Sequence, residues 1–226
     1  MKFIQLVVQH VWAEEITKEV YEKWKADYSN WKQGFKLFYG PVKKNPKLMI
    51  LTFNPGGDEN SFQKDFNKFE KGDFSLFTRN EYLTRNYKLA EKMQSFFEEN
   101  EELLASSVTL PIIFWRSKSI KFWKKNFLKK LQKDAEKFCL EKTHEIIQFL
   151  EPAYILILGF ETYSVLSKNY GPFSNTHEIR GTKNRKIGLK AKWENRPLFC
   201  ILHPSGARIS KADWAKNKRM FFEFVR

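Results

Sequence analysis

The sequence predicts an α/β fold: a single-domain three-layer sandwich in which a four-stranded, mainly parallel sheet is flanked by helices. Short apolar runs alternate with longer segments of helical periodicity, which is the pattern of strands joined by crossover helices. Two of these runs end in a polar residue, a proline and small residues, as loops at the carboxyl ends of strands do. Because no repeat, linker or change in composition divides the chain, we assign residues 1–226 to one domain.

The first third of the chain is predicted to contain one helix and one strand. Residues 11–32 carry aromatic and aliphatic residues at spacings of three and four, which predicts an amphipathic helix. Residues 47–53 are mostly apolar and form the first predicted strand. Residues 58–80 are polar, contain scattered phenylalanines and show no clear period, so we expect a long loop with room for one helical turn.

Helices and strands alternate through the middle of the chain. Residues 86–104 are predicted to be helical, and residues 108–115 form a second strand in which Pro111 indicates an edge position or a bulge. Residues 119–150 predict one or two basic helices. Residues 153–158 are wholly apolar apart from one tyrosine hydroxyl, which is typical of a strand buried on both faces.

The last part of the chain supplies one further core strand. A short helix is predicted to follow Gly159 and to end near Leu166. Residues 171–195 are read as a loop or a hairpin, and residues 198–202 as the last core strand. Ser210 is a suitable N-cap for a final helix.

The charge balance favours a polyanionic partner. The formal net charge is +14 and the pI is about 9.6, which suits nucleic acid first and an anionic membrane second. An ordinary basic protein with no such partner is the alternative. Aromatic residues make up 16% of the chain, and some of them are expected to stack on bases beside the cations.

Cysteine usage and the N-terminal residues bear on cofactors and compartment. Cys139 and Cys200 are too few for a four-thiolate iron–sulfur cluster, and no CxxC pair exists for zinc, so we expect no metal and no cofactor. No disulfide framework is indicated, which predicts a reducing compartment. Residues 1–10 are too short and too polar for a secretion signal or a membrane span, so a cytoplasmic protein is expected.

Two loops carry the residues that are the best candidates for catalysis or binding. Asn54 follows the first predicted strand, and His203 follows the last one. We expect both on adjacent strand ends, because loops at the carboxyl ends of strands line the ligand crevice of an α/β sheet. Each loop alone has a plainer explanation, namely a strand-end turn for Asn54 and a half-buried histidine for His203.

The two loops resemble the signature motifs of the uracil-DNA glycosylase superfamily. Residues 54–56 (Asn-Pro-Gly) resemble its first motif, and residues 203–208 (His-Pro-Ser-Gly-Ala-Arg) resemble its second. Residues 155–159 (Ile-Leu-Ile-Leu-Gly) resemble the strand-plus-glycine element between them. The family has a four-stranded parallel sheet flanked by helices. The resemblance extends over roughly residues 36–210, with motif identity at about a dozen positions.

The resemblance implies a monofunctional DNA glycosylase that flips a base out of the stack and hydrolyses its N-glycosidic bond without a cofactor. By this resemblance, His203 stabilises the negative charge on the leaving base, and Asn54 holds the attacking water. An amide is no strong base, so the nearby carboxylates Asp58 and Glu59 are alternative bases.

The resemblance also implies how DNA is held. Ser205 and Gly206 would present a hydroxyl and backbone amides to phosphates beside the target. Arg208 falls where several relatives insert a wedge into the duplex, and a guanidinium can fill the vacated space. The residues expected to touch DNA are Gly56, Gly57, Ser205, Gly206 and Arg208.

The expected base is a C5-substituted pyrimidine. Gly56 stands where some members of the superfamily have a tyrosine that blocks the C5 side. The end of the second strand lacks the asparagine that uracil-selective relatives carry there, so uracil is not the expected base. The expected pocket residues are Phe53, Phe62, Trp115 and Arg116, with Phe66, Phe69 and Phe74 as other candidates for stacking.

Two further expectations concern setting and class. Modified pyrimidines occur in phage DNA, so antiviral defence is a plausible role for a monomeric enzyme of this kind. The alternative is a catalytically inactive nucleic-acid-binding protein of the same fold, in which lysines and arginines of residues 116–130 and 180–192 neutralise phosphates.

Overall fold

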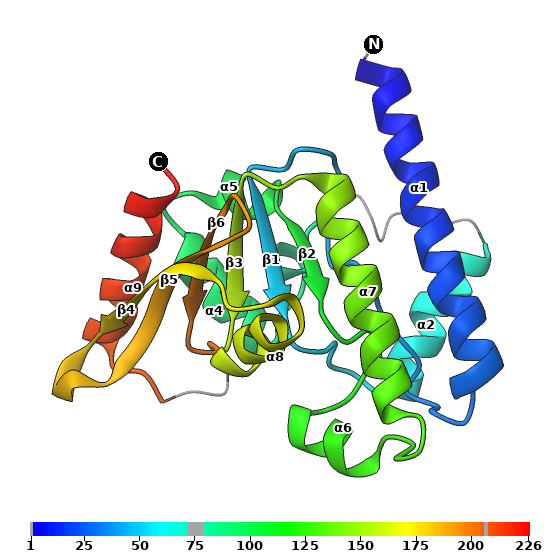
Figure 1. Cartoon of the computed structure of the whole chain (residues 1–226). Coiled ribbons are helices and arrows are strands. Elements are labelled where there is room, and N and C mark those ends of the chain that lie inside the picture. The colour runs from blue at the N-terminus through cyan, green and yellow to red at the C-terminus, as the bar shows by residue number, and fades with distance from the viewer. Residues whose placement is uncertain (1, 72–78, 206–207) are drawn as a thin grey trace.

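The computed structural model describes residues 2–71, 79–205 and 208–226, excluding the side chains of residues 2–10, 69 and 70. Within that part of the chain, one sheet has six strands in the order β2-β1-β3-β6-β5-β4 (Figure 1). The strands are β1 (Leu48–Thr52), β2 (Val108–Pro111), β3 (Tyr154–Leu158), β4 (Ser174–Arg180), β5 (Lys186–Trp193) and β6 (Arg196–Ile201).

The prediction of four strands is wrong, but the four predicted strands are β1, β2, β3 and β6, and they run parallel side by side. Their register aligns Ile50 with Thr109 and Leu156, and Leu156 with Phe199. β5 lies antiparallel to β6, and β4 lies antiparallel to β5. The sheet is therefore mostly, but not purely, parallel.

The two additional strands form a hairpin in residues 171–195, for which the sequence predicts a loop or a hairpin. β4 is a polar edge strand in which Ile179 is the buried residue, so its sequence has no apolar run. β5 does carry a signal, since apolar residues alternate along it at positions 187, 189, 191 and 193. The lysines between these apolar residues give the segment a high positive charge, which makes the alternation hard to recognise in the sequence.

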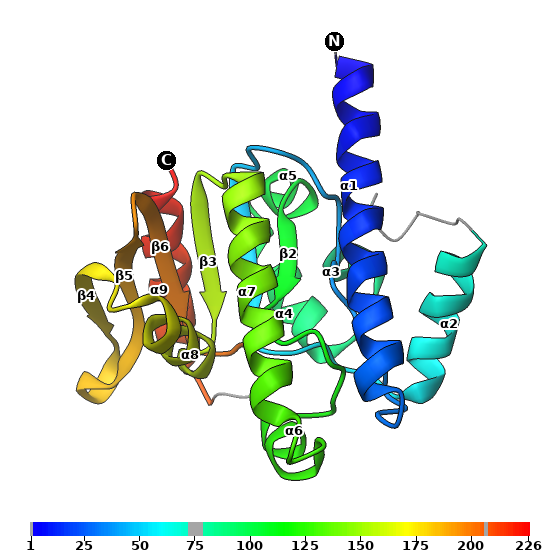
Figure 2. The ribbon, with the colours of Figure 1, turned by 45° about the vertical axis from the view of Figure 1, so that its right-hand side comes forward.

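Helices cover both faces of the sheet, as predicted. One core joins alternate strand residues such as Met49 and Ile155 to α1 (Lys2–Lys23), α7 (Gln132–Leu150) and α8 (Phe160–Tyr170). The other joins Ile50 and Leu156 to α4 (Lys88–Phe97), α5 (Glu101–Ala105) and α9 (Lys211–Phe224). Figure 2 shows α1 and α7 on one side of the strands and α4 on the other.

The segment expected to be a long loop contains a helix instead, α2 (Glu59–Glu70). Its N-terminus is capped by Asp58, whose Oδ1 accepts hydrogen bonds from the amide and hydroxyl of Ser61. Phe62 and Phe66 lie one turn apart and pack against aromatic rings of residues 21–24. That four-residue spacing was the helical signal, and the polar residues around it obscured the period.

The remaining helices differ from prediction mainly in their ends. The N-terminal helix starts earlier than residue 11 and continues into a π-helical turn, Trp24–Tyr28. Residues 119–150 form two helices, α6 (Ile120–Asn126) and α7, and Ser210 caps α9 as predicted. β2 lies at the sheet edge that Pro111 indicated. The described residues also contain two short elements, α3 (Glu81–Thr84) and a 3-10 turn, Thr182–Asn184.

The parallel strands β2, β1, β3 and β6 all end at one edge of the sheet, at the bottom of Figure 1. α6, α8 and the β4–β5 turn lie along the same edge. We refer to this edge as the carboxyl edge, and it contains both motif loops.

No helix in the described part of the chain combines the length and apolarity needed to cross a membrane.

Candidate functional site at the carboxyl edge

The side-chain amide of Asn54 is held in one orientation just after β1. Its Nδ2 donates to the carbonyl oxygen of Pro55 at 2.9 Å and to that of Ser117 at 3.0 Å. Because carbonyl oxygens only accept, the NH₂ group must face them. Oδ1 therefore points the other way, and no donor in the described residues contacts it. The loop thus presents a fixed hydrogen-bond acceptor.

Ser117 lies in the segment between β2 and α6 and connects this segment to the Asn54 loop. Its amide donates to the carbonyl of Pro55 at 2.9 Å, and its Oγ lies 3.1 Å from Asn54 Nδ2. The Ser117 hydroxyl donates to the carbonyl of Ser119, the residue that caps α6. Sequence reasoning gave Ser117 no role of its own, since a contact across 63 positions leaves no local pattern.

Arg116 lies beneath the first loop rather than in an open pocket. Its side chain is 5% exposed, and its Nη1 donates to the carbonyl of Gly56 at 3.1 Å. Nη2 pairs with Asp65 of α2, and Asp65 is also 3.1 Å from Lys36 Nζ. Arg116 therefore supports the backbone of the loop, which argues against the predicted direct contact with a base.

Asp65 is ionised within this buried network. Burial by itself raises the pKa of the Asp65 carboxyl, but the charges of Lys36 and Arg116 outweigh that effect and hold the pKa below its usual value. Lys36 also pairs with Glu81 of α3. The network joins α2, α3 and the segment between β2 and α6 under the Asn-Pro-Gly loop.

The two glycines of the first loop have different requirements. Gly57 has φ +107°, and a Cβ there would lie 2.8 Å from Arg116 Nη1. At Gly56, a Cβ would meet nothing within 4 Å, and the residue is exposed. Only glycine fits position 57, whereas position 56 has open space beside it.

Asp58 has a structural explanation as the cap of α2. Its carboxyl is exposed, and the hydrogen bonds from Ser61 lower its pKa. A carboxylate with a lowered pKa is a weaker base than an ordinary one. These observations favour Asn54 over Asp58 as the group that contacts the water.

His203 follows β6 and packs against the backbone of Gly159. A Cβ on Gly159, whose φ is +97°, would lie 3.3 Å from His203 Cβ. Ser205 Oγ is 3.1 Å from His203 Nδ1. Burial lowers the pKa of His203, so the imidazole is neutral at neutral pH. A Ser205 hydroxyl that donates to Nδ1 leaves the ring proton on Nε2.

The two motif loops are not on adjacent strand ends, which corrects that expectation. β3 lies between β1 and β6, and its carboxyl end is followed by Gly159. With neighbouring strands about 4.8 Å apart, the ends of β1 and β6 are separated by roughly 10 Å. Gly159, which follows the intervening strand, adds no side chain of its own between Asn54 and His203.

Two aromatic residues that were expected near the base, Trp115 and Phe62, are buried in the core. Trp115 is 0% exposed and lies among Tyr28, Phe127 and Phe138. Phe62 packs against Gly34 and Trp24. This burial argues against Trp115 and Phe62 as residues that stack on a base. The others expected near the base include Phe53, which is 3% exposed, Phe69, whose side chain is not described, and Phe74, which lies outside the described residues.

The second loop ends at an exposed arginine. Arg208 is exposed, and its carbonyl accepts a hydrogen bond of 2.6 Å from Arg185 Nη1. Ser205 is half-buried. Gly206, which was expected to contact phosphate, lies outside the described residues. The exposed position of Arg208 suits the predicted contact with DNA.

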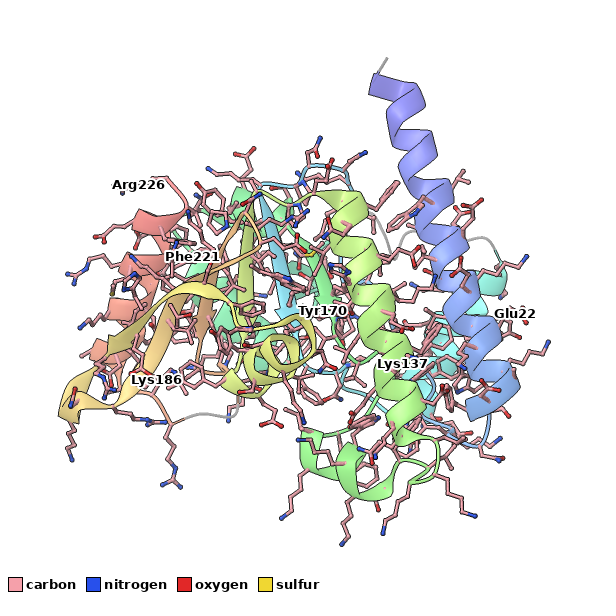
Figure 3. The ribbon with its side chains drawn as sticks, viewed as in Figure 1. Glu22, Lys137, Tyr170, Lys186, Phe221 and Arg226 are labelled. Carbon is pink, nitrogen blue, oxygen red and sulfur yellow. The ribbon has the colours of Figure 1, made fainter. Side chains whose placement is uncertain are left out.

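Cations flank the site on both sides. An open cavity of about 570 Å³ between α6 and α8 is lined by Ile120, Lys121, Lys124, Lys125 and Glu161. Figure 3 shows nitrogen-tipped side chains reaching away from the body at α6 and at the β4–β5 turn, where Lys186 is labelled. The carboxyl edge is thus bordered by positive charge.

No group of three or more histidine, cysteine, aspartate and glutamate side chains with metal-binding geometry occurs in residues 2–71, 79–205 and 208–226.

In comparisons with known proteins, no family model and no curated sequence matches the chain. The motifs and the geometry of the carboxyl edge are therefore the features that bear on function.

Proposed function

We propose that the protein is a DNA glycosylase of the uracil-DNA glycosylase type. The observation that carries the proposal is the carboxamide of Asn54, which two carbonyl oxygens hold so that Oδ1 stays available as an acceptor. A neutral His203 lies at the end of β6, on the other side of β3 from β1. The basic surroundings suit DNA, and the two loops resemble the signature motifs of that superfamily.

The proposed chemistry assigns one role to each loop. Asn54 Oδ1 accepts a hydrogen bond from water and orients its oxygen towards C1′ of a flipped nucleotide. The bond from C1′ to the base nitrogen breaks, and the base leaves with the bonding pair while water adds to C1′ and releases a proton. Nε2–H of His203 donates to the base carbonyl oxygen as negative charge develops there. The products are an abasic site and the free base.

The proposed substrate is a pyrimidine with a substituent at C5. The open space beside Gly56 supports this, because no side chain there would block such a group. Phage DNA is one source of bulky pyrimidines, so antiviral defence is the proposed setting, with a cytoplasmic monomer as the acting species. Repair of a damaged or mismatched base is the other setting that the chemistry allows.

Base release from defined duplexes tests the proposal. The protein is incubated with duplexes that carry uracil, mismatched thymine, hypoxanthine, or 5-hydroxymethylated or glycosylated cytosine, and abasic sites are cleaved with hot alkali. We expect strand breaks with at least one C5-substituted base and little with uracil. Asn54→Ala and His203→Ala should abolish them, whereas the exposed His177→Ala should not.

Two results would overturn the enzyme proposal: no base released from any duplex, or release unchanged in both Asn54→Ala and His203→Ala. Uracil released as well as the bulky pyrimidines would overturn the substrate class alone.

A catalytically inactive DNA-binding protein is the second candidate. The amide of Asn54 cannot take up a proton, and this favours binding without turnover. Tight binding to an abasic duplex, with no base released from any of the duplexes, would support this candidate. Turnover that depends on His203 would exclude it.

A further inference from the structure

The β4–β5 turn is part of the carboxyl edge although it belongs to the antiparallel part of the sheet. β5 starts where β6 ends, since Gly188 pairs with Ile201 and the amide of Leu202 donates to the carbonyl of Ile187 at 3.2 Å. The turn at residues 181–185 therefore lies beside the loop that contains His203. The sequence assigns the cations of residues 180–192 a general phosphate-binding role only in the inactive alternative, and the proposed chemistry gives this turn none.

Three sets of hydrogen bonds fix this turn to the second loop and to α9. Arg185 Nη1 donates to the carbonyl of Arg208 at 2.6 Å. The amide and hydroxyl of Thr182 donate to the two carboxylate oxygens of Asp213, at 2.7 and 2.8 Å. Lys216 Nζ donates to the carbonyl of Arg180 at 2.7 Å. The turn is thus held in one position relative to the site.

The charges of the turn are only partly neutralised. Glu178 pairs with Arg180 and with Lys186. Lys183 and Arg185 are exposed and have no carboxylate within ion-pair distance among the described residues. Lys183 is therefore free to bind an anion next to the second loop.

Arg185 is partly engaged, since its Nη1 donates to the carbonyl of Arg208. It also lies near enough to Asp213 to add to the effect of the Thr182 hydrogen bonds, which lower the pKa of that carboxyl. Arg185 forms no ion pair in the described chain, so its charge can also act on an anion.

The backbone conformation of the turn also indicates that Lys183 is placed to bind a partner. Lys183 and Asn184 both have φ +56°, in the left-handed region that favours glycine and asparagine. Lysine is a costly choice at such a position, and its side chain is not used in a contact within the described chain. A long cation at the tip of a fixed turn is suited to reach a partner.

We propose that the β4–β5 turn is a second DNA-binding element, in which Lys183 and Arg185 bind backbone phosphates on the side of the target nucleotide opposite α6. This inference takes DNA as the partner and so rests on the proposed function. Arg185 has a further role as a positioning residue, because its bond to the carbonyl of Arg208 sets where that side chain leaves the second loop.

A pair of matched variants tests the proposal. Lys183→Gln removes one positive charge from the turn, and Lys192→Gln removes the same charge from the other end of the same hairpin. Lys192 belongs to the basic run 180–192, but it is exposed at the other end of β5, where it pairs with Pro197 at the start of β6. It therefore lies away from the carboxyl edge and outside the proposed phosphate contacts. Binding of the full chain to a fluorescent duplex with an abasic site is followed by anisotropy at several salt concentrations.

We expect Lys183→Gln to weaken binding severalfold and to lower the slope of log K against log salt by about one. Lys192→Gln should leave both unchanged, and unaltered thermal unfolding shows that each variant is folded. Adding Arg185→Gln to Lys183→Gln should weaken binding further. It should also lower cleavage of a duplex more than cleavage of a single strand, which a simple loss of phosphate contact would not do.

The outcomes separate this inference from the proposed function. Equal binding by Lys183→Gln and Lys192→Gln, with an active parent protein, overturns the role of the turn and leaves the glycosylase proposal standing. A parent protein that neither binds nor cleaves DNA overturns the proposed function itself. Preferential binding of RNA by the parent protein overturns the choice of partner.

Discussion

The two motif loops at the carboxyl edge are held in different ways. Directional hydrogen bonds hold Asn54, and the ion network of Arg116 and Asp65 supports the backbone beside it. His203 is held mainly by packing, against the backbone of Gly159, with one polar contact to Ser205. The first loop thus fixes the direction of an acceptor, and the second fixes the charge state of a ring.

This difference matches the two proposed roles. A group that orients water must point one way before the reaction begins, and hydrogen bonds provide that direction. A neutral ring that donates to a developing charge must carry its one proton on the nitrogen that faces the base. Burial keeps the imidazole neutral, and a Ser205 hydroxyl that donates to Nδ1 keeps that proton on Nε2. Variants that break one kind of support and leave the other intact can test the comparison.

The largest expected effect follows from removing the carboxylate beneath the first loop. Asp65→Asn leaves Lys36 and Arg116 without their shared negative charge, and breaking a buried ion pair of this kind costs about 3 kcal/mol or more. Urea unfolding at neutral pH measures this loss. Because the pKa of Asp65 is lowered by folding, its stabilisation is full above about pH 4 and is lost as the pH falls further towards the folded-state pKa. The variant should lack that acid-dependent loss.

Asp58→Asn is the matched control for Asp65→Asn. It removes the same charge, but asparagine caps helices as well as aspartate, so stability should change little. It also tests the alternative base, because base release should persist if Asp58 only caps α2. Complete loss of release with an intact fold would assign the base role to Asp58 instead.

The second prediction compares the neighbouring glycines of the first loop. Gly57→Ala introduces a Cβ at φ +107° and 2.8 Å from Arg116 Nη1, so it should cost about 1–3 kcal/mol and displace the loop. Gly56→Ala meets open space and should change stability little. Unfolding and base release are measured for both variants. Similar losses at the two positions would show that Arg116 does not support the loop.

The third prediction concerns the packing that holds the second loop. Gly159 and Gly171 both have positive φ, but a Cβ would contact His203 only at Gly159. Alanine at either position should cost about 1 kcal/mol or more in stability. Base release should fall only for Gly159→Ala, measured under conditions in which both variants are folded. An equal fall in both would attribute the effect to stability alone.

The smallest expected effect comes from the one polar contact of His203. Ser205→Ala removes a hydrogen bond worth about 1 kcal/mol, which is roughly a fivefold loss in rate of base release. Ser205→Thr keeps the hydroxyl and should restore the rate. Because burial lowers the pKa of His203, the rate of the parent protein should be constant above about pH 6.5 and fall only at lower pH, as the ring gains a proton. A rate that rises on acidification through that range would contradict a neutral His203.

The sequence by itself determined the alternation of strands and helices, the four parallel strands and the Ser210 cap, and Pro111 limited β2 to an edge position or a bulge. These follow from local periodicity, proline chemistry and capping, which act over a few residues. It also placed Asn54 and His203 at strand ends, because the strands before them are continuous apolar runs. The charge of the chain indicated an anionic partner but not the surfaces that would meet it.

Only the tertiary structure decided which residues support the site. The bonds of Asn54 to Ser117, of Arg116 to Asp65 and of Arg185 to Arg208 join positions 63, 51 and 23 residues apart. No local pattern encodes such pairs, since each partner satisfies ordinary local rules where it stands. The same reason explains the burial of Trp115 and Phe62, since an aromatic residue near a strand end suits a core and a binding pocket equally until the helices packed against it are known.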